Sequence, residues 1–96
     1  DVASPYRAAA ARMRGRARLQ LGDRPGAGEE FEVAEGLNPR DGSVWTDIGR
    51  FRASGGDVAG ALAAADRAVA LAPASAEALI LRGELGEMHE PGKLPQ

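Results

Sequence analysis

The sequence predicts an all-α fold of about five helices, arranged as antiparallel helix pairs in a right-handed α-α superhelix. The main observation is a 34-residue period, because a period of this length indicates one supersecondary unit that is repeated and stacked. No stretch alternates apolar and polar residues between turn signals, which argues against strands. The residues that recur at this period are Gly15, Gly49 and Gly83; Gly22 and Gly56; Asp23 and Asp57; Ala27 and Ala61; Ala34 and Ala68; Leu37 and Leu71; and Pro39 and Pro73.

The first helix is expected over residues 5–21. Ser4 provides an N-cap, Pro5 suits a first helical turn, and the alanine, arginine, methionine and leucine residues that follow are strong helix formers. Gly22 ends this helix and Asp23 caps the next one, since glycine adopts the left-handed conformation after a helix end and aspartate accepts unpaired backbone N–H groups. The first repeat is therefore predicted to be a helix-turn-helix pair.

The second helices of the two pairs are expected over 25–37 and 58–71. Each is followed by a proline, Pro39 or Pro73, which cannot continue a helix and keeps the residue before it out of the helical region. By the same reasoning, the other turn residues are Asp41 and Ser75, which cap the third and fifth helices, and Gly55, Gly56 and Asp57, which separate the third and fourth.

Small residues recur at fixed places in the repeat. A glycine inside a helix costs up to ~1 kcal/mol relative to alanine, so its recurrence implies a compensating contact. We expect neighbouring helices to approach most closely at these places, where a larger side chain would strain the core. The positions concerned are Gly15, Gly49, Gly83, Ala27, Ala61, Ala34 and Ala68.

The repeat resembles the motif of the tetratricopeptide family. The second copy has Trp45, Ile48-Gly49, Ala61, Ala68 and Pro73 at the intervals of that motif. About two and a half repeats are predicted, over 8–41, 42–75 and a partial copy at 76–90, within a single domain of residues 1–90 and a tail or linker at 91–96. The departures from the motif are Ala11 in place of Trp, Arg18 and Arg52 in place of Tyr, and Ala65 in place of Phe.

This resemblance implies a binding scaffold whose first helices line a concave groove for a peptide segment of a partner protein. Asp47, Glu77 and Leu81 stand where the chaperone-tail clamp of the family has an asparagine and basic residues, so that clamp is not expected. The groove positions carried over from the family are Ala9, Arg12, Met13, Arg16 and Leu19; Ser43, Thr46, Asp47, Arg50 and Ala53; and Glu77, Ile80, Leu81 and Glu84.

Charge is segregated along the chain despite a net charge of −2. Residues 1–22 are rich in arginine and residues 23–41 in glutamate, and the simplest interpretation is internal pairing between the two helices of one repeat. A sharper alternative is that Arg12, Arg16 and Arg50 form a solvent-facing strip for an acidic peptide. A nucleic-acid ligand is a third alternative. The net negative charge of the chain and the absence of aromatic residues between the arginines disfavour it.

The sequence offers few residues in patterns that indicate catalysis, and no enzyme activity, cofactor or metal site is expected. The single histidine, His89, is interpreted as a solvated residue near a helix end, and the glutamates at 29–35 as a solvated helix face. The chain has no cysteine, which excludes disulfides and thiolate metal sites. No apolar run approaches the ~20 residues that a membrane span needs, so no membrane insertion is expected, and a cytoplasmic or a periplasmic location fits equally.

The predicted last helix has more apolar surface than one neighbour can cover. Either Glu84, Glu87 and Glu90 make it a polar cap on a monomer, or its exposed patch contacts another copy or a following segment, which is the interpretation we favour. Two further functions therefore remain open, a self-association or assembly module, and an accessory domain of a larger enzyme whose catalytic domain lies outside these residues. The apolar residues in question are Leu79, Ile80, Leu81, Leu85 and Met88.

Overall fold

Residues 4–89 are described by a computed structural model, and they form five α-helices and no strand. The predicted all-α class and helix number are confirmed over this range. The side chain of His89, Glu90 and the predicted linker at 91–96 lie outside the described residues. The helices are α1 (Ser4–Gln20), α2 (Arg24–Leu37), α3 (Gly42–Ser54), α4 (Val58–Leu71) and α5 (Ala76–His89).

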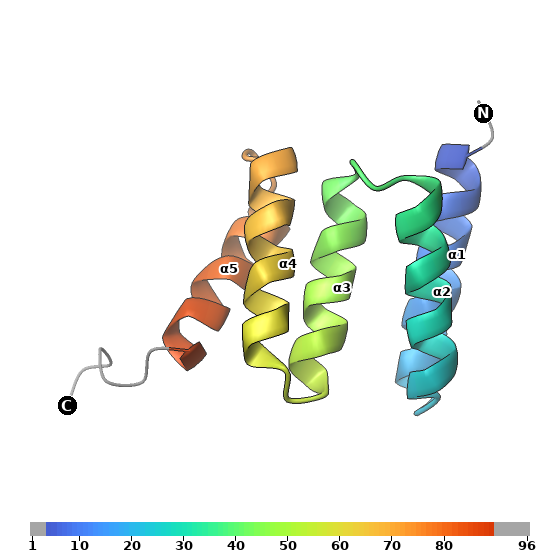
Figure 1. The fold of residues 1–96 in the computed structure, drawn as a ribbon, viewed down its shortest axis with the longest axis horizontal. Helices are drawn as coiled ribbons and strands as arrows, with labels where there is room; N and C mark the ends of the chain where they lie inside the picture. Colours follow the sequence, from blue (N-terminus) through green and yellow to red (C-terminus); the bar gives the residue numbers. More distant parts are fainter. Residues whose placement is uncertain (1–3, 90–96) are drawn as a thin grey trace.

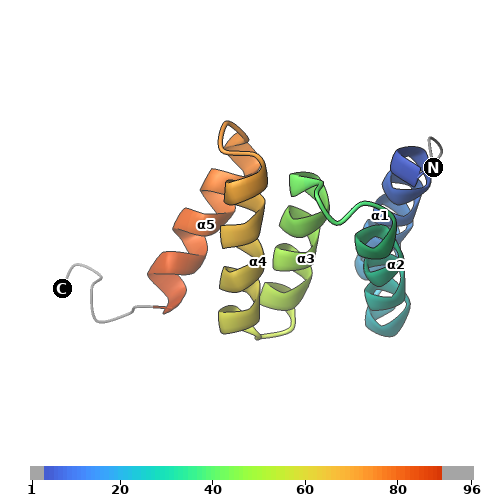
Figure 2. The same ribbon diagram turned by 45° about the horizontal axis from the view of Figure 1, so that its top comes forward.

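Consecutive helices run antiparallel and follow one another along an elongated molecule of 49 × 30 × 17 Å (Figure 1). The α1–α2 pair lies at one end, the α3–α4 pair in the middle and α5 at the other end, as the turned view in Figure 2 also shows. Helix α3 contacts α1, α2 and α5 as well as its own partner α4. The pairing of adjacent helices therefore agrees with the prediction, and the handedness of the superhelix stays a prediction.

The turns inside the two helix pairs are formed as the sequence predicts. Gly22 and Gly56 have φ angles of +84° and +88°, in the region that favours glycine. The carboxylates of Asp23 and Asp57 each accept a hydrogen bond from the backbone N–H three residues later, at 3.0 and 2.9 Å. These hydrogen bonds satisfy donors that the first turn of a helix leaves unpaired.

The core is made largely of alanine, with few large side chains. Phe31 is the one aromatic residue of the described chain that is fully buried, and Trp45 and Phe51 pack against the same cluster from partly buried positions. The first cluster comprises Ala11, Ala27, Phe31, Ala34, Val44, Ile48 and Ala64. The second cluster, at the α5 end, comprises Ala61, Ala65, Leu81 and Leu85.

Two of the three repeated helix glycines lie at close contacts. A Cβ atom on Gly15 would lie 2.7 Å from the Phe31 ring, and one on Gly49 would lie 2.9 Å from Leu81. A Cβ on Gly83 would have nothing within 4 Å, so the expected close approach at Gly83 is wrong. The reason is that, within the described chain, no helix follows α5 to occupy the place that α2 occupies beside α1.

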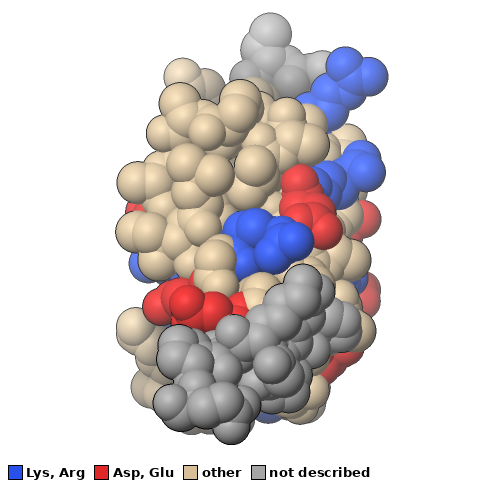
Figure 3. Space-filling view, turned by 90° about the vertical axis from the view of Figure 1, so that its left-hand side faces the viewer, with Lys and Arg blue, Asp and Glu red and all other residues tan. Residues whose placement is uncertain are grey.

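Helix α5 is covered on one side only. Leu81 and Leu85 are buried in the second core cluster, whereas Leu79, Ile80 and Met88 remain 49, 60 and 57% exposed. The expectation that one neighbour cannot cover all the apolar side chains of this helix is therefore confirmed for those three residues. Seen from the α5 end, most of the upper surface carries neither acidic nor basic side chains (Figure 3).

Candidate functional site

The side chains expected to line a groove come from α1, α3 and α5, and these helices contact one another in series through α3. We call this surface the first-helix face. Its predicted residues differ in accessibility. The structure leaves Met13, Arg16, Arg50, Ile80 and Glu84 exposed, Arg12 and Leu19 half-buried, and Thr46, Asp47 and Leu81 buried.

The three buried members of this set serve the fold. Thr46 donates a hydrogen bond from Oγ1 to the carbonyl of Gly42 at 2.9 Å, inside its own helix. Leu81 packs in the second core cluster, next to Gly49. These side chains are therefore engaged within the fold, and a ligand on the first-helix face would meet the exposed residues instead.

The expected basic strip is partly neutralised by carboxylates from the first helix of the following repeat. Arg12 Nε lies 2.8 Å from Asp47 Oδ2, and the Arg12 side chain is only 21% exposed. Arg50 Nη1 lies 3.4 Å from Glu77 Oε2. A strip of three solvent-facing arginines is therefore wrong as predicted, because Arg12 is half-buried and paired. Arg16 and Arg50 are both exposed, and of these two only Arg16 forms no ion pair within residues 4–89.

Arg16 borders a shallow depression on the surface of α1. Its lining residues are Met13, Arg16, Ala17 and Gln20. Two of these, Met13 and Arg16, are among the predicted groove residues. The depression is an open surface feature, which suits contact with a peptide better than enclosure of a small molecule.

Charge pairing inside the first repeat follows the simpler of the expected arrangements. Arg14 Nε of α1 lies 3.0 Å from Glu30 Oε2 of α2, and Arg18 Nε lies 3.4 Å from the same oxygen. Arg18 Nη1 also lies 3.1 Å from Asp23 Oδ2. The hydrogen bond from the Gly26 N–H, followed by that from Arg18, lowers the pKa of Asp23 below its ordinary value of 3.8.

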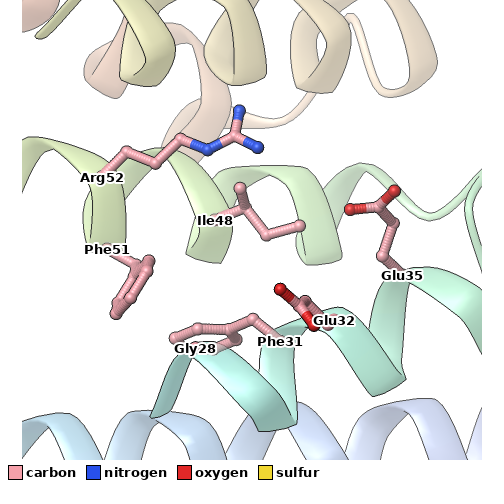
Figure 4. A pocket seen from close by; sticks show the side chains of 7 residues that line it. All are labelled: Gly28, Phe31, Glu32, Glu35, Ile48, Phe51 and Arg52. Carbon is pink, nitrogen blue, oxygen red and sulfur yellow. The ribbon is translucent and has the colours of Figure 1, made fainter. Parts of the chain in front are cut away.

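A cavity of about 160 Å³ lies between α2 and α3, and we call it the α2–α3 pocket (Figure 4). Its apolar lining includes Phe31 and Phe51, whose ring centroids are 5.5 Å apart with an interplanar angle of 58°. Two glutamates rise from α2 toward α3 at its edge. The complete lining is Gly28, Phe31, Glu32 and Glu35 from α2, with Ile48, Phe51 and Arg52 from α3.

The charges at the edge of this pocket are not paired with each other. Arg52 donates a hydrogen bond through Nη1 to the carbonyl of Gly60 on α4, at 3.2 Å. Within the described part of the chain, neither Glu32 nor Glu35 takes part in an ion pair. The pocket therefore combines an apolar, aromatic wall with two carboxylates that are free to meet a cation.

Sequence reasoning missed this pocket. The glutamates at 29–35 were interpreted as a solvated helix face, and the structure leaves Glu32 exposed and Glu35 half-buried beside the cavity. The spacing between α2 and α3, which creates the cavity, depends on how the first repeat packs against the second. The one available signal was Phe51 with Gly28, an aromatic residue and a helix glycine outside the repeated positions.

Trp45 lies at the edge of the first core cluster. Its indole Nε1 donates a hydrogen bond to the carbonyl of Pro39 at 2.7 Å. The guanidinium of Arg67 lies 4.9 Å from the centre of its ring. The indole is thus held by the fold on several sides, and it is not a free anchor for a ligand.

No protein-family model matches this chain, and no curated protein matches it either. None of the described helices is long and apolar enough to cross a membrane. In residues 4–89, no three side chains of histidine, cysteine, aspartate or glutamate are grouped so that they could hold a metal ion.

Proposed function

We propose that this chain is a tetratricopeptide-like protein-interaction module that binds a peptide segment of a partner protein on the first-helix face. The observation that carries the proposal is that helix-turn-helix units with a 34-residue period keep their first helices in contact through α3. Stacked repeats of this kind form extended surfaces suited to peptide ligands. Exposed residues of differing chemistry, including Met13, Arg16, Arg50 and Ile80, occupy that surface here.

The two ion pairs of this face support a preorganised surface. Arg12 and Asp47 join α1 to α3, and Arg50 and Glu77 join α3 to α5. A surface whose helices are held together before binding loses less conformational entropy when a ligand binds. Arg16, which has no such partner in the described chain, is the cation most available to an acidic residue of the peptide. Exposed charges of this kind act mainly on the association rate and weaken with salt.

The test is to select a peptide from a displayed random library and to measure its affinity by fluorescence anisotropy. The double substitution Arg16→Ala and Ile80→Ala removes one cation and one apolar contact from the first-helix face. We expect it to weaken binding about tenfold, which corresponds to about 1.4 kcal/mol. The matched control is Arg40→Ala with Val33→Ala, which removes one arginine and one β-branched aliphatic residue from exposed positions elsewhere. Equal affinities of the two double variants, or failure to select any peptide, would contradict the proposal.

A second candidate function is self-association through α5, and the exposed side chains of Leu79, Ile80 and Met88 favour it. Sedimentation velocity over a wide concentration range would detect a dimer, and Leu79→Lys with Met88→Lys should return it to a monomer. The control, Leu21→Lys with Val33→Lys, changes two exposed apolar residues outside α5. A monomer at every concentration would exclude this function.

A further inference from the structure

We propose that the α2–α3 pocket binds a lysine or arginine side chain from a basic segment of a partner protein. This site is separate from the first-helix face, since none of its seven lining residues is among the predicted groove positions. The proposal does not require that a peptide bind at that face. It rests on the shape of the cavity and on the charges at its edge.

The shape suits a long side chain with an apolar stem. Phe31, Ile48 and Phe51 provide apolar wall, and the volume of about 160 Å³ is far more than the ~10–15 Å³ that one water molecule requires. Gly28 helps to keep the cavity open, because a Cβ atom there would lie only 3.2 Å from the ring of Phe51. Lysine and arginine bury their methylene stems against apolar surface while the charged end remains near polar groups.

The charges select a cation as the occupant. Glu32 and Glu35 are one helical turn apart, so they lie on one face of α2 beside the apolar wall. Both carboxylates lack an ion-pair partner within residues 4–89, in contrast to Glu30, which binds both Arg14 and Arg18. An ammonium or guanidinium group held between them would form charge-assisted hydrogen bonds. Glu32 is exposed and Glu35 half-buried, so an apolar occupant would leave these acceptors to water and gain no charge-assisted hydrogen bond.

The aromatic wall already binds a cation from within the chain. The guanidinium of Arg24 lies 4.3 Å from the centre of the Phe51 ring, and it is held there by a hydrogen bond to the carbonyl of Phe51 at 3.1 Å. Arg24 is not among the residues that line the pocket. Arg52, the one cation that lines it, is engaged with the Gly60 carbonyl of α4. A basic side chain from outside would therefore supply the charge that the pocket lacks.

The experiment uses the synthetic octapeptide acetyl-(Leu-Arg)4-amide as the probe and the whole chain as the receptor, followed by NMR. We expect the backbone resonances of Gly28, Ile48 and Phe51 to shift on titration. The double substitution Glu32→Gln and Glu35→Gln should weaken binding at least about tenfold, because both charge-assisted partners are lost. Gly28→Met, which fills the pocket and keeps both carboxylates, should weaken it to a similar extent. Circular dichroism verifies that each variant is folded.

Three controls separate this proposal from others. Glu29→Gln with Glu87→Gln removes the same charge from exposed positions outside the pocket and should change the affinity less than about threefold. Arg16→Ala with Ile80→Ala, the variant that tests the first-helix face, should leave octapeptide binding unchanged. The uncharged probe acetyl-(Leu-Gln)4-amide should not bind. The proposal is overturned if the two glutamate pairs have equal effects, if Gly28→Met binds normally, or if the uncharged probe binds equally well.

Discussion

Arg12 of α1 and Asp47 of α3 form an ion pair that joins the first repeat to the second, with 2.8 Å between Nε and Oδ2. The Asp47 side chain is only 4% exposed, and Arg12 is the charged partner that it contacts. The two residues are 35 positions apart, one more than the repeat period. The first helices of the two repeats are thus joined by a contact between residues that do not occupy equivalent positions of the repeat.

Loss of this partner should destabilise the fold. We expect Arg12→Ala to lower the free energy of unfolding by about 2 to 3 kcal/mol, because a buried carboxylate would remain without its charged donor. Urea denaturation measures the change. The matched control is Arg16→Ala, which removes an exposed arginine from the same helix and should cost less than about 0.5 kcal/mol. Equal effects of the two substitutions would show that the buried carboxylate is satisfied in another way.

Substitution by leucine should have opposite effects on stability at Gly49 and at Gly83. Gly49→Leu should destabilise the protein by about 1 to 3 kcal/mol through overpacking, because even a Cβ atom there approaches Leu81 and the Ala61 carbonyl. Gly83→Leu should stabilise α5 by up to about 1 kcal/mol, since its Cβ would meet no atom within 4 Å and leucine is the better helix former. Thermal melts followed by circular dichroism would reveal the opposite signs. A melt that Gly49→Leu leaves unchanged would contradict the packing described for α3.

The N-cap of α4 can be tested at Asp57, whose carboxylate accepts the hydrogen bond from the Gly60 N–H. We expect Asp57→Ala to lower the free energy of unfolding by about 1 kcal/mol, because that donor loses its partner. Asp57→Ser retains a side-chain acceptor and should cost markedly less. A serine variant as unstable as the alanine variant would mean that the cap hydrogen bond is not what stabilises this turn.

The corresponding cap of α2 predicts a dependence on pH. Because the pKa of Asp23 is lower in the folded chain than its ordinary value of 3.8, the ionised carboxylate stabilises the fold above that value. This contribution should be lost as the pH falls below about 3.8 and through the folded pKa. Melting temperatures between pH 6 and pH 2 should fall less steeply for Asp23→Asn than for the parent chain. Identical slopes would show that this carboxyl group does not contribute.

Local signals account for the accuracy of the helix predictions. The turn glycines and capping aspartates act on the backbone within a few residues, and the second helix of the second repeat, Val58–Leu71, has the bounds that were expected. The buried alanines were also predicted, because their recurrence reflects contacts that each repeat makes in the same way. Ala27, Ala34, Ala61 and Ala68 are all completely buried.

The groove residues were predicted less well, for a reason visible at Arg12. Its place in the repeat predicts a groove position, but its accessibility depends on which side chains the neighbouring repeat places beside it. Asp47 pairs with Arg12 and lowers its accessibility, and a family motif does not specify such a partner. The same applies to Leu81, whose side chain turns into the core beside Gly49.

Local sequence signals predict the class of fold, the number of helices and the turns, since helix caps, prolines and left-handed glycines act through hydrogen bonds and torsion angles of adjacent residues. The packing of the helices in three dimensions sets which charges are paired, leaves Gly83 open while Gly15 and Gly49 are packed, and places Glu32 and Glu35 beside a cavity with Phe51. These features depend on distances between helices. Such distances follow from how all the side chains of neighbouring repeats pack together, which no short stretch of sequence specifies.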